Sequence, residues 1–436
     1  MNEPHRGPGM FERPEQQPAL FADIVGGVTT FFTMSYIVVV NPGILASPGT
    51  GMPFSGALTA TVLVASSMTM LMGLYARLPF AVAPGMGLNA FFAYTIVIQQ
   101  HVPWQTALGM VFWAGVLFLL VSATPLREVI ATSIPANLRL AAAGGIGLLL
   151  TLIGFRNAGL IEADPATILR LGTIDHRAAL MLLGLVIAVL LQQRRNPLAF
   201  LTSILVVTAA AWLFRYAAPP ERAFSAPDFS STFLQLDVLG ALKVSLLPAV
   251  VSILFTDLFD SLSTFIGVAT AAGLTERDGR PLHLRRGLIV DAVATLGAGL
   301  AGTSSGTAYV ESIAGIRMGG RSGRASVVTA LCFFPCFFVA PFAASVPGYA
   351  TAGVLVLVGL AMFQMVAKIN FSTTEDSLPA FVTIVLIPLT LSITQGILWG
   401  FVLHALLYVA VGRVREVTAM SWVLAVISAG LLVLAH

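Results

Sequence analysis

Apolar stretches long enough to cross a lipid bilayer follow one another along almost the whole chain. A bilayer-spanning helix needs about 20 mostly apolar residues, and windows of this kind recur with only short polar breaks. Of the 436 residues, 57% are hydrophobic and only 10% are charged, whereas soluble domains carry about 25% charged residues. Because so few charges cannot cover a water-facing surface, the sequence predicts an integral membrane protein embedded as one unit.

The apolar windows form two sets of seven, separated by a polar stretch at 215–233. The predicted spans lie near residues 22–41, 56–76, 81–99, 105–122, 139–155, 178–193, 197–214, 246–272, 287–301, 304–317, 325–343, 351–367, 377–393 and 396–412. A last apolar run, 422–434, is short for a span and fits equally along the membrane interface. Residues 1–20 are polar and Pro-rich, which predicts a disordered tail and no cleavable signal peptide.

The positive charges give an independent test of this topology. With a cytoplasmic N-terminus, the fourteen spans leave 17 of the 23 Lys and Arg residues on the cytoplasmic side. Cytoplasmic loops normally carry this excess. A single missed span would move every later loop to the opposite side of the membrane and destroy the excess. The scattered Arg residues therefore read as topology signals, and no basic cluster with interleaved aromatics points to nucleic acid.

Two of the predicted spans open with segments that should interrupt a helix. The third begins AVAPGMGLNAFF (81–92) and the tenth begins within GAGLAGTSSGTAYVES (297–312). Irregular backbone survives at membrane depth only where it is buried in protein or lines a cavity. Interrupted segments at matching places in two halves point to a transporter's binding site. Since each half holds an odd number of spans, the two repeats must be inverted in the membrane.

Acidic residues lie in two of these spans, and a polar amide lies at the break of a third. Asp257 and Asp260 are three residues apart in span eight, and Ser261 and Thr264 continue the same helix face. Span ten contributes Glu311, one turn after Thr307, and span three contributes Asn89 at its Gly-rich break. Because intramembrane carboxylates usually face the bundle interior and serve transport, these residues are site candidates. Their simpler interpretation is as buried groups satisfied by neighbouring hydroxyls, or for Asn89 as a helix cap.

Several other residues are expected to be structural. Asp23, Asp291 and Glu375 lie near predicted span ends and read as interfacial or capping residues, although Asp291 could instead join a network behind the site. Cys332 and Cys336 share an apolar helix face without a nearby His or acid, so packing is expected. Nothing in the sequence indicates a metal or another cofactor.

Four segments of the chain closely resemble the AzgA-like purine permeases, the adenine/guanine/hypoxanthine branch of the nucleobase–cation symporters. They are GGVTTFFTMSYIVVVNPGIL (26–45), MGLYARLPFAVAPGMGLNAFFAYTIV (72–97), FTDLFDSLSTFIGVA (255–269) and GTSSGTAYVESIAG (302–315). Weaker similarity at 144–161 and 387–401 extends the likeness over about residues 20–415. Ser263, Gly306 and Ala308 depart from the family pattern, which leaves the preferred purine open.

The resemblance implies an all-α polytopic fold of about 14 transmembrane helices in two inverted seven-helix repeats, like the uracil permeases. Short extended strands would open spans three and ten. After the tail, 1–20, a core domain would comprise 21–122 and 245–343, and a gate domain would comprise 123–244 and 344–415. A C-terminal apolar segment, 416–436, would follow.

The same resemblance implies residue roles. Asp257 and Glu311 would accept hydrogen bonds from purine N–H groups, and Asn89 would shape the site. Asp260, together with Asp257 and Glu311, would couple transport to protons. Phe259 is a candidate to stack on the base and Thr307 a candidate to contact it, although a chain with 28 Phe uses most of them in packing.

The sequence thus predicts a secondary transporter that imports purine bases by proton symport, with an elevator-like movement of core against gate. It would lie in the plasma membrane, the inner membrane in a bacterium, as a monomer or homodimer with no nucleic-acid partner. Alternatives are an anion exchanger of the same fold, for sulfate or bicarbonate, and a xanthine or uracil permease. An aspartyl protease is disfavoured because Asp257 and Asp260 share one helix, whereas a catalytic dyad faces across a cleft.

Overall fold

The computed structural model describes residues 20–124, 135–275 and 281–434, and this part of the chain is predominantly helical. The first half contains α1 (Leu20–Met34), α2 (Ile37–Leu45), α3 (Phe54–Leu71), α4 (Met86–Ala90), α5 (Trp104–Ala123), α7 (Ala136–Asn157), α8 (His176–Gln193) and α9 (Ala199–Leu213). The second half contains α10 (Leu247–Ala272), α11 (Leu284–Ala301), α12 (Ser312–Arg317), α13 (Gly323–Phe333), α14 (Ala340–Ala344), α15 (Gly348–Phe363), α16 (Thr374–Thr390), α17 (Ile393–Ala410) and α18 (Ala419–Leu434).

The helices reproduce the predicted apolar spans closely. Each predicted span overlaps a helix or, at spans three and ten, a strand followed by a short helix. Within the described ranges, eight helical segments are long and apolar enough to cross a membrane, and four further apolar helical segments are shorter. The fourteen-span count and the inverted repeat therefore stay predictions.

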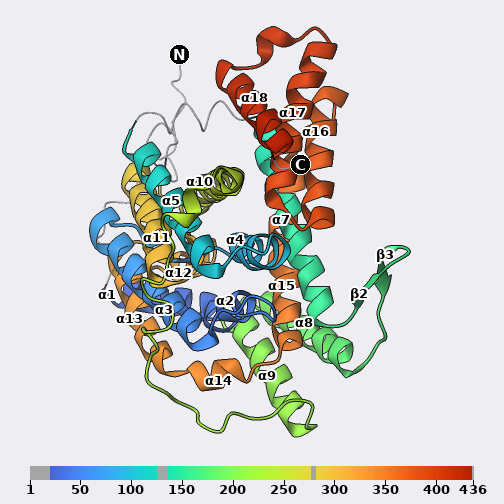
Figure 1. Cartoon of the computed structure of the whole chain (residues 1–436). Helices are drawn as coiled ribbons and strands as arrows, with labels where there is room; N and C mark the ends of the chain where they lie inside the picture. The colour runs from blue at the N-terminus through green and yellow to red at the C-terminus, as the bar shows by residue number, and fades with distance from the viewer. Residues whose placement is uncertain (1–19, 125–134, 276–280, 435–436) are drawn as a thin grey trace, which may run out of the picture.

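Two local features differ from the sequence analysis. The first predicted span, 22–41, lies within one apolar helical segment, Leu20–Leu45, but that segment contains a turn at Ser35 and Tyr36 between α1 and α2. A strand pair that the sequence analysis did not predict follows α7. It consists of β2 (Ile161–Asp164) and β3 (Ile168–Leu171) in antiparallel register, and it projects from the helices as a hairpin (Figure 1). This hairpin is largely exposed, so no apolar periodicity marks it.

The helices pack in two groups (Figure 1). In one group α1 packs against α12 and α13, α3 against α2, α11 and α13, and α5 against α10 and α11. In the other, α7 packs against α15 and α16, α8 against α9 and α15, and α16 against α17. Each group combines segments from both halves of the sequence, so the two halves interleave.

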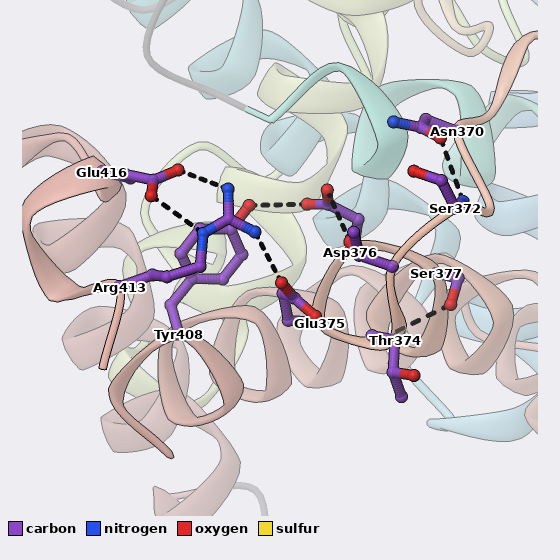
Figure 2. A network of polar contacts seen from close by, with 10 residues as sticks. Asn370, Ser372, Thr374, Glu375, Asp376, Ser377, Tyr408, Arg413 and Glu416 are labelled. Atoms are coloured by element: carbon purple, nitrogen blue, oxygen red, sulfur yellow. Dashed lines mark hydrogen bonds and ion pairs between the residues drawn. The ribbon is translucent and has the colours of Figure 1, made fainter. Parts of the chain in front are cut away.

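Polar contacts tie α16 and α17 together at one end of the second group (Figure 2). Arg413, just after α17, donates to Glu375 of α16 over 2.5 Å and to Glu416 over 2.8 Å. The Tyr408 hydroxyl of α17 donates to Asp376 of α16 over 2.6 Å. Glu375, expected near a span end, is therefore an ion-pair partner at the start of α16.

The connection between α9 and α10 is fastened to the first helix group by Asp228. The Asp228 carboxylate accepts hydrogen bonds from the Ser55 hydroxyl in the first turn of α3 over 2.8 Å and from the Ser231 hydroxyl over 2.7 Å. Its backbone N–H donates to Thr59 over 3.0 Å. The Ser231 hydroxyl, followed by the Ser55 and Ser230 hydroxyls, holds the pKa of Asp228 below its ordinary value against the opposing effect of partial burial.

Asp228→Asn should therefore destabilise the protein in a pH-dependent way. A carboxyl with a lowered folded-state pKa stabilises the fold above its unfolded pKa, and this contribution is lost as pH falls through the lowered value. We expect a loss of about 1 kcal/mol near neutral pH, reduced by solvent screening. Thermal unfolding of both proteins should show a gap in Tm that narrows below about pH 4. A Tm difference between the two proteins that is equally large at neutral pH and below about pH 4 would contradict the assignment.

Candidate functional site

The two interrupted segments meet as a short antiparallel strand pair in the interior of the first helix group. Strand β1 (Val82–Pro84) pairs with β4 (Gly306–Ala308), with Ala83 opposite Thr307. All six strand residues are buried. Pro84 cannot donate to the ladder, and its carbonyl oxygen instead accepts the Tyr309 hydroxyl over 2.5 Å. The strands expected at spans three and ten are thus present.

Side chains from neighbouring helices satisfy the strand edges. The Thr69 hydroxyl of α3 donates to the Val82 carbonyl oxygen and accepts from the Val82 N–H, both over 2.9 Å. The Ser312 hydroxyl accepts the Ala81 N–H over 3.0 Å. Because buried backbone groups without partners are costly, these hydroxyl contacts allow extended backbone to persist between helices.

Asp257 lies behind this strand pair on α10. Its side chain is fully buried, and Oδ2 accepts a hydrogen bond from the Thr295 hydroxyl of α11. The same hydroxyl lies 3.1 Å from the carbonyl oxygen of Gly306 in β4, so Thr295 joins Asp257 to the strand. Asp257 Oδ1 is buried without a hydrogen-bond partner among the described residues. A buried acceptor of this kind is expected to have a partner, and a ligand N–H would supply one.

Asp291 was expected to be interfacial or a cap, and this interpretation is wrong. The residue is fully buried within α11, where its Oδ2 accepts the Ser261 hydroxyl of α10. The Ser261 hydroxyl also lies 3.3 Å from the Thr307 hydroxyl in β4. The alternative that Asp291 joins a network behind the site therefore describes its position. The error arose because α11 begins at Leu284, which places Asp291 two turns inside the helix.

Glu311 immediately precedes α12 and is held by a residue that sequence reasoning missed. The Tyr36 hydroxyl donates to Glu311 Oε1 over 2.7 Å, and the Tyr36 side chain is buried. The Tyr36 ring also contacts Phe200 of α9 edge-on, with ring centroids 5.1 Å apart. Tyr36 stands at the turn between α1 and α2, where only a break in the apolar pattern would have marked it. Asp260, one turn after Asp257, is close enough to Glu311 for their charges to interact.

Asn89 lies on the other interrupted segment, at the end of α4. Its Oδ1 accepts the Ser304 hydroxyl, so it bonds to the segment leading into β4. A second buried amide was not singled out from the sequence: Asn41 of α2 donates to Thr61 over 2.7 Å and to Thr303 over 2.9 Å. Both amides therefore hold the hydroxyl-rich stretch 303–305 in place.

The structure thus brings most of the candidate residues to one region. Asp257 is joined through Thr295 to Gly306 at the start of β4, Thr307 lies within β4, and Glu311 lies just beyond its end. Asn89 holds the segment before β4 from the other interrupted span. Phe259 is directed elsewhere: its ring stacks on Phe255 at 6.0 Å between centroids and lines a cavity toward α7, α16 and α17. Within the described ranges, no cluster of three or more His, Cys, Asp or Glu side chains could hold a metal.

Comparison with known proteins assigns this chain to a family. Residues 21–399 match the Permease family known as Xan_ur_permease. A putative permease of Methanocaldococcus jannaschii, MJ0326, is 40% identical over 96% of both chains. The adenine permease AdeP of Escherichia coli is 37% identical over 94% of this chain and 93% of its own. The guanine/hypoxanthine permease PbuO of Bacillus subtilis is 36% identical over 96% of this chain and 98% of its own.

Solved structures with the same fold are more distant in sequence. The transmembrane domain of the cyanobacterial bicarbonate transporter BicA has a TM-score of 0.66 and 17% identity, covering 87% of this chain and 97% of that domain. The murine anion transporter Slc26a9 has a TM-score of 0.61 and 12% identity, covering 91% of this chain and 69% of its own. At such identities the likeness concerns the fold alone.

These matches confirm the resemblance found in the four sequence segments. They extend over nearly the whole length of this chain and of each relative named. The chain is therefore a multi-pass membrane protein of the Permease family, in the branch that contains adenine and guanine/hypoxanthine permeases, and it is a transporter rather than an enzyme.

Proposed function

We propose that the protein imports the purine bases adenine, guanine and hypoxanthine across the cell membrane, coupled to protons. The observation that supports this most strongly is the pair of carboxylates, Asp257 and Glu311, beside the strand pair. Asp257 has a buried oxygen without a partner among the described residues. Relatives that are named adenine and guanine/hypoxanthine permeases, and that match over more than nine-tenths of this chain, support the substrate class.

In this proposal the base binds between α10 and the strand pair. A purine edge offers several N–H donors, and a carboxylate accepts more than one at a time. Asp257 and Glu311 would take these N–H groups, and Thr307 would contact the base from β4. Asn89 would keep the opposite segment in register through Ser304. Phe259, which faces α7, α16 and α17, would not contact a base bound there.

Proton coupling is assigned to Asp260, Asp257 and Glu311. Burying a carboxylate charge costs several kcal/mol unless a cation or hydrogen bonds compensate it. In the described ranges no Lys or Arg forms an ion pair with these carboxylates; the ion pairs found there involve other acids. A bound proton would remove the cost of moving an uncompensated charge through the membrane interior.

Movement is assigned to the two helix groups. The core would comprise residues 21–122 and 245–343 and the gate residues 123–244 and 344–415, in fourteen spans of two inverted repeats with a cytoplasmic N-terminus. The base would travel with the core as it shifts against the gate. The packing of each helix group from both halves of the sequence supports this division. A homodimer would hold the gate still in the bilayer.

Uptake of radiolabelled bases by cells lacking their own purine permeases tests the proposal. We expect accumulation of adenine, guanine or hypoxanthine that a protonophore abolishes. Accumulation of only xanthine or uracil would move the substrate class to a sister branch. Sulfate or bicarbonate exchange without uptake of any base would favour the anion-exchange alternative, for which carboxylates around the strand pair are unsuited.

Asp291→Asn should lower purine uptake about tenfold at equal amounts of protein in the membrane, because a hydrogen bond to a charged group contributes about 1.5–3 kcal/mol. The asparagine has the same volume, but its uncharged side chain weakens the hydrogen bond from the Ser261 hydroxyl. The Ser261 hydroxyl, which also contacts Thr307, would then be less well positioned. Ser261→Ala should give a loss of the same kind. Initial rates of uptake provide the measurement. Unchanged rates in both variants would show that the contact between Asp291 and Ser261 does not contribute to transport.

A further inference from the structure

Tyr36 lies at the boundary between the two helix groups, in the turn between α1 and α2 of the first group. Its carbonyl oxygen accepts the backbone N–H groups of Val39 and Val40 over 3.1 and 3.0 Å, which fixes the turn at the start of α2. The side chain is almost completely buried, with 1% of its surface exposed. Because a buried tyrosine hydroxyl normally finds a hydrogen-bond partner, the contacts of this side chain indicate its role.

The Tyr36 hydroxyl holds the side chain of Glu311. It donates to Oε1 of Glu311 over 2.7 Å. The Tyr309 hydroxyl, two residues before Glu311, donates to the Pro84 carbonyl oxygen instead. Glu311 precedes α12 without capping it, and its side chain is partly exposed. Since a glutamate side chain has several rotatable bonds, a carboxylate that nothing held would lose conformational freedom on binding a ligand.

The Tyr36 ring contacts the second helix group. It meets the Phe200 ring of α9 edge-on, with the ring centroids 5.1 Å apart and the ring planes at 86°. Edge-to-face pairs of this kind are favourable beyond the area that they bury. Helix α9 packs against α8 and α15 of the second group. One side chain therefore contacts a candidate substrate ligand through its hydroxyl and the opposite helix group through its ring.

We propose that Tyr36 is a positioning residue for Glu311, and that it makes the affinity for the base depend on where α9 lies. This inference rests on the proposed function. With Oε1 bound by the Tyr36 hydroxyl, the Glu311 carboxylate is held in one orientation, and Oε2 would accept a purine N–H. The Phe200 ring in turn holds the Tyr36 ring. When the core moves against the gate, Phe200 would leave Tyr36, so Glu311 would be held less firmly and the base would be bound more weakly.

Equilibrium binding of radiolabelled adenine, guanine and hypoxanthine to the purified protein tests this role. We expect Tyr36→Phe, which keeps the ring and removes the hydroxyl, to raise Kd about tenfold for each purine that the wild type binds. Phe200→Leu, which keeps an apolar side chain but removes the ring, should raise Kd about threefold. The double variant should bind no more weakly than Tyr36→Phe, because Phe200 would act through the hydroxyl that this variant already lacks.

Tyr408→Phe is the matched control. It also removes a tyrosine hydroxyl that donates to a carboxylate, here from Tyr408 to Asp376 over 2.6 Å within the second helix group (Figure 2). The control should leave Kd unchanged, although it loses a contact of the same kind. A difference in Kd between the two Tyr→Phe variants therefore separates the positioning of Glu311 from a general loss of stability.

An unchanged Kd in folded Tyr36→Phe would overturn the positioning of Glu311 while leaving purine transport by the wild type intact. An unchanged Kd in Phe200→Leu, or losses that multiply in the double variant, would overturn the dependence on α9. If the wild type binds no purine, the proposed function fails and this inference fails with it. If Tyr36→Phe does not fold, Phe200→Leu decides the question, because it weakens the hold on Tyr36 and keeps the hydroxyl.

Discussion

Asp257→Asn should abolish purine uptake, with a loss of about 100-fold or more. Hydrogen bonds to a charged acceptor contribute about 1.5–3 kcal/mol each, and tenfold corresponds to about 1.4 kcal/mol. The substitution preserves side-chain volume but replaces one oxygen with an N–H₂ group. That group either faces the base as a donor or breaks the contact from Thr295, which also reaches Gly306 of β4. Both outcomes remove acceptor capacity where the base would bind.

Initial rates of radiolabelled uptake, with the amount of folded protein measured in the same membranes, test this expectation. The matched control is Asp164→Asn, which makes the same change in the exposed β2–β3 hairpin, where Asp164 Oδ1 accepts only local N–H and hydroxyl groups. It should transport at the wild-type rate. Near-normal uptake by a folded Asp257→Asn protein would exclude Asp257 as a substrate ligand.

Gly27→Val should leave little folded protein. A Cβ at Gly27 would lie 2.4 Å from the carbonyl oxygen of Ala325 and 2.7 Å from Cβ of Val328, both on α13. Small residues permit this close approach of membrane helices, and the Thr329 hydroxyl uses it to donate to the Gly27 carbonyl oxygen over 2.9 Å. Overpacking costs roughly 1–3 kcal/mol or more, and here the obstacle is backbone rather than a flexible side chain.

Gly43→Val is the matched control, since Gly43 is exposed on α2 and a Cβ there has no neighbour within 4 Å. Fluorescence-detected gel filtration after heating should show a large loss of monodisperse protein for Gly27→Val and a small change for Gly43→Val. Similar thermal profiles for the two variants would contradict the close packing of α1 on α13.

The sequence predicted the interruptions well because their cause is local. Pro84 and the neighbouring glycines disfavour a regular helix, and the Gly- and Ser-rich run before Glu311 does the same. The pairing of Ala83 with Thr307 is a contact across more than 200 residues. Local pattern cannot specify it, and the family resemblance implied the two strands but not their pairing. The same holds for the bond from Thr295 to Asp257, since helical phase alone does not give the neighbouring helix.

The residues that were missed share a physical reason. Tyr36 and Asn41 sit singly within apolar runs, where each resembles a packing or capping residue. Their significance depends on the side chains that they contact across the helix interface, which are Glu311 for Tyr36 and Thr61 and Thr303 for Asn41. Asp291 was misplaced because hydropathy locates a span end only to within a turn.

Transport by the purified protein in liposomes tests the central claim most directly. With an imposed inward proton gradient, the account predicts that at least one of labelled adenine, guanine and hypoxanthine accumulates, that a protonophore collapses the accumulation, and that Asp257→Asn liposomes show none. Failure of correctly inserted protein to accumulate any of the three bases under that gradient, or accumulation that Asp257→Asn leaves unchanged, would contradict it.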